Sequence, residues 1–408
     1  MKTTLATPSV APLVVPVLAG ISVSHLLNDT MQSVIPALFP ILEQTMHLSY
    51  SQLGLVAFAN NITASLLQPL IGWYTDRKPL PFLLPVGMFC TLLGMGVLAF
   101  APNLTFVILA VMLVGLGSAV FHPEGSRLVI SSAGSRPGLA QSIFQVGGNS
   151  GQALAPLLTL LFFARQGQAG AVWFVGMAAL AMLILYGLAR WHRGHLERQA
   201  LHGTADGVRT SAAPRRAVAL ALAVILLITF ARSWYVAGIT NFYALFQIKT
   251  FGASLSAAQT HVFVFLVAGA LGTLVGGGLA DRFGKKKMLI FSSAACAPFS
   301  WLLTFSPEPW TYVLLAVTGF SILTGFSVAL IYTLELLPGK TGTVSGLLFG
   351  LAFGLGAMGS MVLGWLGDRI GLPDMLMWCS LIPIIGLLAF ALPPDDKLRA
   401  WSRPPGVS

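Results

Sequence analysis

Long runs of apolar residues, separated by short polar or proline- and glycine-rich segments, dominate this chain. None of these runs alternates apolar and polar residues as membrane β-strands do, and each approaches the roughly 20 residues that a helix needs to cross a bilayer. The pattern therefore predicts an all-α membrane protein. We place twelve membrane helices at 14–42, 50–74, 80–101, 104–130, 137–163, 170–190, 216–247, 255–280, 286–306, 310–336, 342–367 and 373–392.

The composition supports this assignment. Of the 408 residues, 56% are hydrophobic and only 9% are charged, whereas a soluble domain carries roughly a quarter charged residues. Too little polar surface is available to cover a water-exposed globule, and too many aliphatic residues are present for a disordered chain. A soluble enzyme and a disordered protein are both excluded.

The basic residues are distributed very unevenly. If the N-terminus is inside, 19 of the 23 Lys and Arg residues lie at inner ends and loops, and only Arg165, Lys249 and Arg369 lie in outer loops. Arg232 lies near the middle of an apolar stretch, 216–247. The bias predicts a multi-pass protein of the cytoplasmic (inner) membrane with both termini cytoplasmic. The net charge of +10 therefore reflects topology, and we expect a lipid bilayer as the surroundings and no nucleic-acid partner.

The longest polar segment divides the chain into two similar halves. We expect an N-terminal six-helix bundle at 1–191, a cytoplasmic linker at 192–215 and a C-terminal six-helix bundle at 216–408. A short sequence recurs in both halves, about half a chain length apart: Gly72-x-x-x-Asp76-Arg77 and Gly277-x-x-x-Asp281-Arg282-Phe283-Gly284-Lys285-Lys286. Such a repeat predicts two parallel six-helix units related by a pseudo-twofold axis along the membrane normal.

These motifs carry a resemblance to a known family. The second copy matches the loop signature of the major facilitator superfamily, whereas the first departs from it after Arg77. Polar runs at 24–29, 121–127 and 138–149 resemble the fosmidomycin resistance protein family of that superfamily, over nearly the whole chain. The resemblance implies the major facilitator fold and the export of small molecules, such as the phosphonate fosmidomycin, in exchange for protons. It implies that Asp76 and Asp281 act in a conformational switch, together with Gly72, Arg77, Gly277, Arg282 and Gly284.

The stretch 137–163 has two distinct faces. Gln141, Gln145, Asn149 and Gln152 form one polar stripe at helical spacing, and small residues occupy another face. Gly151-x-x-x-Ala155-Pro156 resembles the antiporter signature of drug–proton exchangers, with Ala155 in place of its glycine. We therefore add Gly151 and Pro156 to the switch motifs and expect Gln145 and Asn149 to bind substrate.

A few ionisable residues fall near the middle of apolar stretches, where each costs about 3 kcal/mol or more and marks a candidate functional site. His25, Asp29 and Gln32 lie on one face of the first stretch, and Arg232 lies near the middle of 216–247. We predict that Asp29, with Glu124 as second candidate, couples protons with help from His25 and His122. The predicted substrate-binding residues are Arg232, Gln32, Gln145, Asn149 and Arg127, although Arg127 also fits a plain cytoplasmic anchor.

Several alternatives stay open at this point. Asp29 and Arg232 face one pocket or form an ion pair that closes the two halves. The His and carboxylate residues have workable spacing for a divalent metal, but Arg232 would oppose a cation, and we expect no metal. No nucleotide-binding loop is present, so the proton gradient is the expected energy source, with no cofactor. We expect a monomeric secondary transporter and not an enzyme; a proton-coupled importer or a sugar or metabolite exporter is the alternative.

Overall fold

The computed structural model describes residues 13–134, 137–200, 214–306, 310–337 and 341–402. Within these ranges the chain is helical, with no strand. The elements are α1 (Val15–Ala37), α2 (Phe39–Met46), α3 (Tyr50–Arg77), α4 (Leu83–Ala99), α5 (Leu104–Ser132), α6 (Pro137–Gln166), η1 (Gly167–Ala171), α7 (Val172–Ala200), α8 (Arg215–Phe251), α9 (Leu255–Phe283), α10 (Lys285–Leu303), α11 (Trp310–Leu336), α12 (Thr341–Ile370), α13 (Leu372–Leu381), η2 (Ile382–Ala391) and α14 (Asp395–Ser402).

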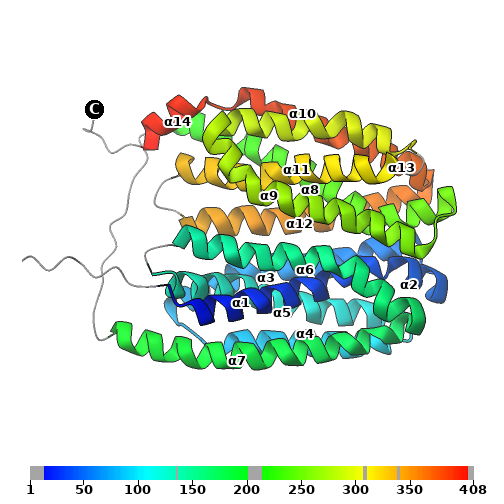
Figure 1. Cartoon of the computed structure of the whole chain (residues 1–408), viewed down its shortest axis with the longest axis horizontal. Coiled ribbons are helices and arrows are strands. Elements are labelled where there is room, and N and C mark those ends of the chain that lie inside the picture. The colour runs from blue at the N-terminus through cyan, green and yellow to red at the C-terminus, as the bar shows by residue number, and fades with distance from the viewer. Residues whose placement is uncertain (1–12, 135–136, 201–213, 307–309, 338–340, 403–408) are drawn as a thin grey trace, which may run out of the picture.

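The helices run side by side in two groups (Figure 1). Helices α1–α7, here the N-half, fill the lower part of the view, and α8–α14, the C-half, fill the upper part. We call the end at which α1 begins and α3 ends the inner end, following the charge prediction, and the opposite one the outer end. This arrangement confirms the predicted fold class of two helical bundles.

The individual helices follow the apolar stretches with two exceptions. Seven helices among the described residues are long and apolar enough to cross a membrane, and the full count of twelve stays a prediction consistent with the fold. The first stretch is divided into α1 and α2 at Leu38, directly after Pro36, whose ring removes a backbone donor. The last stretch ends as the 3-10 segment η2, which begins next to Pro383.

Short polar residues and glycines fix several helix ends. Ser49 begins α3 with a reciprocal capping box, in which its hydroxyl accepts from the Gln52 backbone and its own N–H donates to the Gln52 side chain. Asn103 and Ser254 cap α5 and α9 in the same general way. Gly284 separates α9 from α10 at φ +96°, a conformation that a side chain disfavours. The glycine in the repeated signature is therefore needed for this turn.

Small residues bring the helices of the N-half close together. A Cβ atom placed on Gly117 of α5 would lie 2.6 Å from the Gly87 carbonyl oxygen of α4 and would overlap the Thr91 hydroxyl. In the same way, a Cβ atom placed on Gly94 of α4 would lie 2.6 Å from the Ala110 carbonyl oxygen of α5. Since lipid tails supply no hydrophobic drive between helices, such close packing is a main source of stability.

The two halves meet along two seams, α3 against α12 and α6 against α9. On the first seam, Gly54 lies against the Ser360 backbone and Gly364 against the Tyr50 backbone, so neither has room for a side chain. Nearer the middle, the Ser65 hydroxyl donates to the Gly350 carbonyl oxygen at 2.7 Å. The glycine-rich stretch of α12 is thus a helix-packing surface.

We expect Gly117→Val to lower the stability of the folded protein by about 1–3 kcal/mol, because the branched side chain must push α4 away from α5. Thermal unfolding in detergent would show this as a lower Tm. Gly176→Val is the matched control, since nothing lies within 4 Å of a Cβ at Gly176 on α7. Equal Tm values for the two variants would contradict the packing described here.

Candidate functional site

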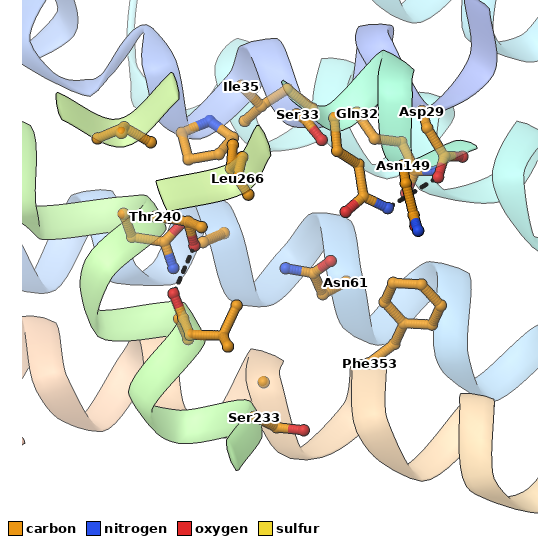
Figure 2. A pocket seen from close by; sticks show the side chains of 18 of the residues that line it. Asp29, Gln32, Ser33, Ile35, Asn61, Asn149, Ser233, Thr240, Leu266 and Phe353 are labelled. Carbon is orange, nitrogen blue, oxygen red and sulfur yellow. Dashed lines mark hydrogen bonds between the residues drawn. The ribbon is translucent and has the colours of Figure 1, made fainter. Parts of the chain in front are cut away.

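A polar cavity of about 260 Å³ lies between the two halves. Figure 2 shows Asp29, Gln32 and Asn149 gathered on one side of it, Asn61 projecting between them and the opposite wall, and Ser233 and Thr240 beyond. The polar residues that line it are Asp29, Gln32, Ser33, Asn60, Asn61, Gln145, Asn149 and Gln152 of the N-half and Arg232, Ser233, Thr240, Asn241, Thr273 and Ser360 of the C-half. Carboxamides therefore dominate the N-half wall, and the lining carries one acid and one base.

Asp29 belongs to a compact group of polar side chains on the N-half wall. One carboxylate oxygen lies 3.4 Å from His25 Nε2 and 3.6 Å from His122 Nε2. Asn28 donates to this same oxygen at 3.0 Å, and Gln152 donates to the other oxygen at 2.9 Å. Asp29 and His25 are buried and His122 is half-buried, so α1, α5 and α6 together build this group.

Both imidazole rings are held in one tautomer. His25 Nδ1 lies 2.7 Å from the Phe144 carbonyl oxygen, and His122 Nδ1 lies 3.0 Å from the Ser118 carbonyl oxygen. A carbonyl oxygen only accepts, so each Nδ1 carries hydrogen and each Nε2 of a neutral ring presents a lone pair. Both Nε2 atoms face the Asp29 carboxylate. Three electron-rich groups thus converge, and a cation between them relieves their repulsion.

The same atoms define where a metal ion could bind. His25, Asp29 and His122 each offer a ligand atom within 4.8 Å of the others, and tethering of Nδ1 to a carbonyl is common behind metal-binding histidines. Arg232 lines the same cavity and opposes a divalent cation. The expectation that no metal binds stays a prediction.

Arg232 stands on the opposite wall without a counter-charge. It is 6% exposed, and its guanidinium carbon lies 4.6 Å from the centre of the Phe326 ring. Its Nη1 has no hydrogen-bond partner, and in the described ranges no carboxylate pairs with it. Asp29 and Arg232 therefore face one cavity, as expected, but they do not form the ion pair that was the alternative.

Three more of the predicted substrate residues, Gln32, Gln145 and Asn149 of the N-half, line the cavity. Gln32 donates to the Ser118 hydroxyl at 2.6 Å, and Gln145 donates to Asn149 at 3.3 Å. Asn60 and Asn61 also line the cavity and were missed, although two adjacent amides in the middle of the apolar run 50–74 were a usable signal.

The polar stripe and the small face of α6 have separate partners. The stripe residues Gln145, Asn149 and Gln152 turn to the cavity. Gly151 packs on the Leu26 backbone of α1, and Gly148 lies against His25 and Asp29. Pro156 reaches the cavity wall. The close approach of α6 to α1 is what brings Gln152 to Asp29.

Glu124 and Arg127 lie away from the cavity lining of the described chain. Glu124 is buried, and its carboxylate lies 3.1 Å from Arg127 Nη1. The same Nη1 donates to the Thr75 carbonyl oxygen at 2.8 Å, near the inner end of α3. The pair joins α5 to α3, which fits a bracing role; their predicted roles in proton coupling and substrate binding remain predictions.

The first copy of the repeated signature ends α3. Gly72 lies against Pro123 of α5, with 3.6 Å between its added Cβ and the Pro123 Cβ. Arg77 covers the Trp73 ring at 4.1 Å and donates to the Trp73 carbonyl oxygen. The Asp76 side chain lies outside the described part of the structure, so its predicted switch role stays a prediction.

The second copy contacts the end of the chain. Asp281 and Arg282 are exposed and Gly277 packs near Ile331. Beyond Gly284, the Lys285 N–H donates to Asp395 at 3.2 Å and its Nζ pairs with Glu335 at 2.9 Å.

Lys286 extends these contacts by donating to the Phe390 and Leu392 carbonyl oxygens at 2.8 and 2.7 Å. These contacts hold α14 on the C-half and do not reach the N-half. The sequence did not indicate this docking.

Comparison with known proteins agrees with the fold. The model of the Major Facilitator Superfamily matches residues 21–356. An uncharacterized MFS-type transporter, YfnC of Bacillus subtilis, is 47% identical over 95% of both chains. The fosmidomycin resistance protein of Escherichia coli is 41% identical over 93% of both chains.

A solved structure shares the same fold. The crystal structure of a bacterial homolog of the human lysosomal transporter Spinster, in an inward-facing and unoccupied conformation, superposes with a TM-score of 0.74. The alignment covers 96% of this chain and 98% of that one at 16% sequence identity. At this identity the likeness concerns the fold alone.

We expect Arg127→Met to destabilise the protein by up to about 3–5 kcal/mol, because it removes the Arg127 guanidinium from its contact with the buried Glu124 carboxylate. The double variant Glu124→Gln/Arg127→Met should recover most of the lost Tm, since the buried charge is then gone. A double variant as unstable as the single one would show that Arg127 acts through other contacts.

Proposed function

This chain belongs to the major facilitator superfamily and, within it, to the fosmidomycin resistance protein family, and we propose that it is a proton-coupled antiporter. It exports a small polar, anionic compound, such as the phosphonate fosmidomycin, across the cytoplasmic membrane. It works as a monomer by alternating access, with both termini in the cytoplasm, and catalyses no chemical reaction.

The observation that carries this proposal is the unpaired guanidinium of Arg232 beside the cavity. A buried cation without a partner is costly, and an anion that enters from the cavity offsets that cost. A phosphonate or carboxylate accepts two parallel N–H donors from one guanidinium. Arg232 therefore binds the acidic end of the substrate and selects against cations.

The N-half wall binds the remainder of the substrate. Gln32, Gln145 and Asn149 offer both donors and acceptors to hydroxyl and amide groups. Since Arg232 lies on the C-half, a bound substrate touches both halves at once. Its binding energy thus depends on how the halves are placed, which couples occupancy to alternating access.

The group of His25, Asp29 and His122 carries the proton. A proton taken up by either Nε2 lies between a ring and the carboxylate and replaces three facing lone pairs with a charge-assisted hydrogen bond. The group touches the cavity through Asp29, so protons and substrate reach it by the same path.

This geometry favours exchange over cotransport. Without the proton, the Asp29 carboxylate faces two lone pairs and, in addition to its bonds from Asn28 and Gln152, accepts hydrogen bonds from donors of the substrate. With the proton, the imidazolium Nε2–H donates to the Asp29 carboxylate, and the substrate loses its hydrogen bonds to that carboxylate. Protonation therefore weakens substrate binding, which is the sign that antiport requires. Flux inward with protons would instead support the importer, and flux of neutral sugars would support the metabolite exporter.

We expect Arg232→Gln to lower the transport of an anionic substrate by about 10–100-fold, the loss of one or two hydrogen bonds to a charged group. Uptake of labelled fosmidomycin into everted vesicles measures it. Arg165→Gln, which removes an exposed arginine at the outer end of α6, is the control. Undiminished transport by a folded Arg232→Gln variant would rule out the anion site.

We expect Asp29→Asn to abolish substrate accumulation driven by a pH gradient, because the amide cannot stabilise an imidazolium. Substrate exchange without a gradient should persist, since the Arg232 site is intact. The same everted vesicles measure both fluxes, and Asp374→Asn at the outer end supplies the control. Full gradient-driven accumulation by Asp29→Asn would remove Asp29 from the coupling mechanism.

A further inference from the structure

Asp368, in the last turn of α12, joins the outer ends of the two halves. Its carboxylate accepts from the Tyr50 and Ser51 backbone N–H groups, both at 2.8 Å, and from the Ser51 hydroxyl. We propose that Asp368 is an outer latch that closes the cavity from the outside and thereby sets the balance between inward-facing and outward-facing states.

The chemistry of the α3 N-terminus explains why an acid from the other half binds there. The first N–H groups of a helix have no partner within the helix. The capping box of Ser49 and Gln52 satisfies the Gln52 N–H. The N–H groups of Tyr50 and Ser51 remain, and Asp368 accepts from both. The positive end of the α3 dipole adds to the attraction.

The latch depends on how the halves are placed. Asp368 lies on α12 of the C-half, whereas Tyr50 and Ser51 lie on α3 of the N-half. Gly364, one turn before Asp368, packs directly on the Tyr50 backbone. Any movement that separates the outer ends of α3 and α12 breaks all these contacts together.

Two further bonds close the same end. Lys249 at the end of α8 pairs with Glu43 of α2 at 2.9 Å, and Gln259 of α9 donates to the Ala37 carbonyl oxygen at 2.9 Å. Lys249 and Asp368 are both exposed. Water can therefore replace these bonds when the halves part, so the latch biases the equilibrium without locking it.

The test measures access to the cavity from outside. Cys90, Cys296 and Cys379 are replaced by alanine and a reporter cysteine is introduced by Thr240→Cys in the cavity wall. A membrane-impermeant maleimide is added to right-side-out vesicles. We expect Asp368→Ala to raise the labelling rate about tenfold, the effect of losing a charge-assisted hydrogen bond. Asp368→Asn, which keeps one acceptor oxygen, should fall between wild type and Asp368→Ala.

Asp374→Ala is the matched control, because Asp374 is an exposed acid in the first turn of α13 near the same end. Labelling of the Asp368→Ala protein at the rate of the Asp374→Ala protein would overturn the latch. The assay involves no substrate and no proton gradient, so its result is independent of the proposed function.

A second pair of variants covers the case in which Asp368→Ala does not fold. Ser51→Cys with Asp368→Cys in the same background, oxidised to a disulfide, should stop transport, and a reductant should restore it. Ser51→Cys with Asp374→Cys tests for non-specific effects of oxidation. Continued transport by the fully cross-linked pair would show that these ends never separate, and the latch would be refuted.

Discussion

The cost of holding charge away from water is the constraint on which the rest of this structure depends. Nearly every basic residue lies at a helix end or loop, where water or lipid headgroups solvate it. Asp29 and Arg232 lie at the cavity between the halves instead, on facing walls. They do not neutralise each other there. The charge on each wall must therefore be stabilised separately, and the two walls do this differently.

In the N-half, neighbouring side chains of the protein stabilise the charge of Asp29. His25, His122, Gln152 and Asn28 surround the Asp29 carboxylate, and the glycines of α6 allow the close packing that brings Gln152 within reach. Among the described residues of the C-half, Arg232 has the Phe326 ring face beside its guanidinium and no acidic partner. A bound proton therefore stabilises the N-half wall, and a bound anion stabilises the C-half wall. A transporter that exchanges the two needs this division.

The sequence predicted the fold well because hydropathy and charge bias act over whole helices. It also placed His25 beside Asp29, since both lie on one helix four residues apart. His122 was grouped with them by its chemistry, but its contact with Asp29 could not be derived from the sequence, because the distance depends on how α5 crosses α1. The docking of Asp395 at the second signature copy was missed for the same reason: the contact joins residues more than 100 positions apart. The spacing of residues along the chain predicts which side chains are neighbours within one helix, but not which side chains meet between helices.

The same limit explains why the contacts at the inner and outer ends of the molecule were not predicted. The repeated signature drew attention to the inner end, yet its second copy binds the chain's own C-terminal helix. The contacts that join the halves at the outer end involve Lys249 and Asp368, and Asp368 stands in Gly364-x-x-x-Asp368-Arg369-Ile370-Gly371, which has the same spacing as the second copy but lies at the outer end. Backbone N–H groups at a helix start donate to a carboxylate that lies near them in space, so this contact depends on how α3 is placed against α12. The outer contact thus joins residues more than 300 positions apart along the chain, which spacing within one helix cannot predict.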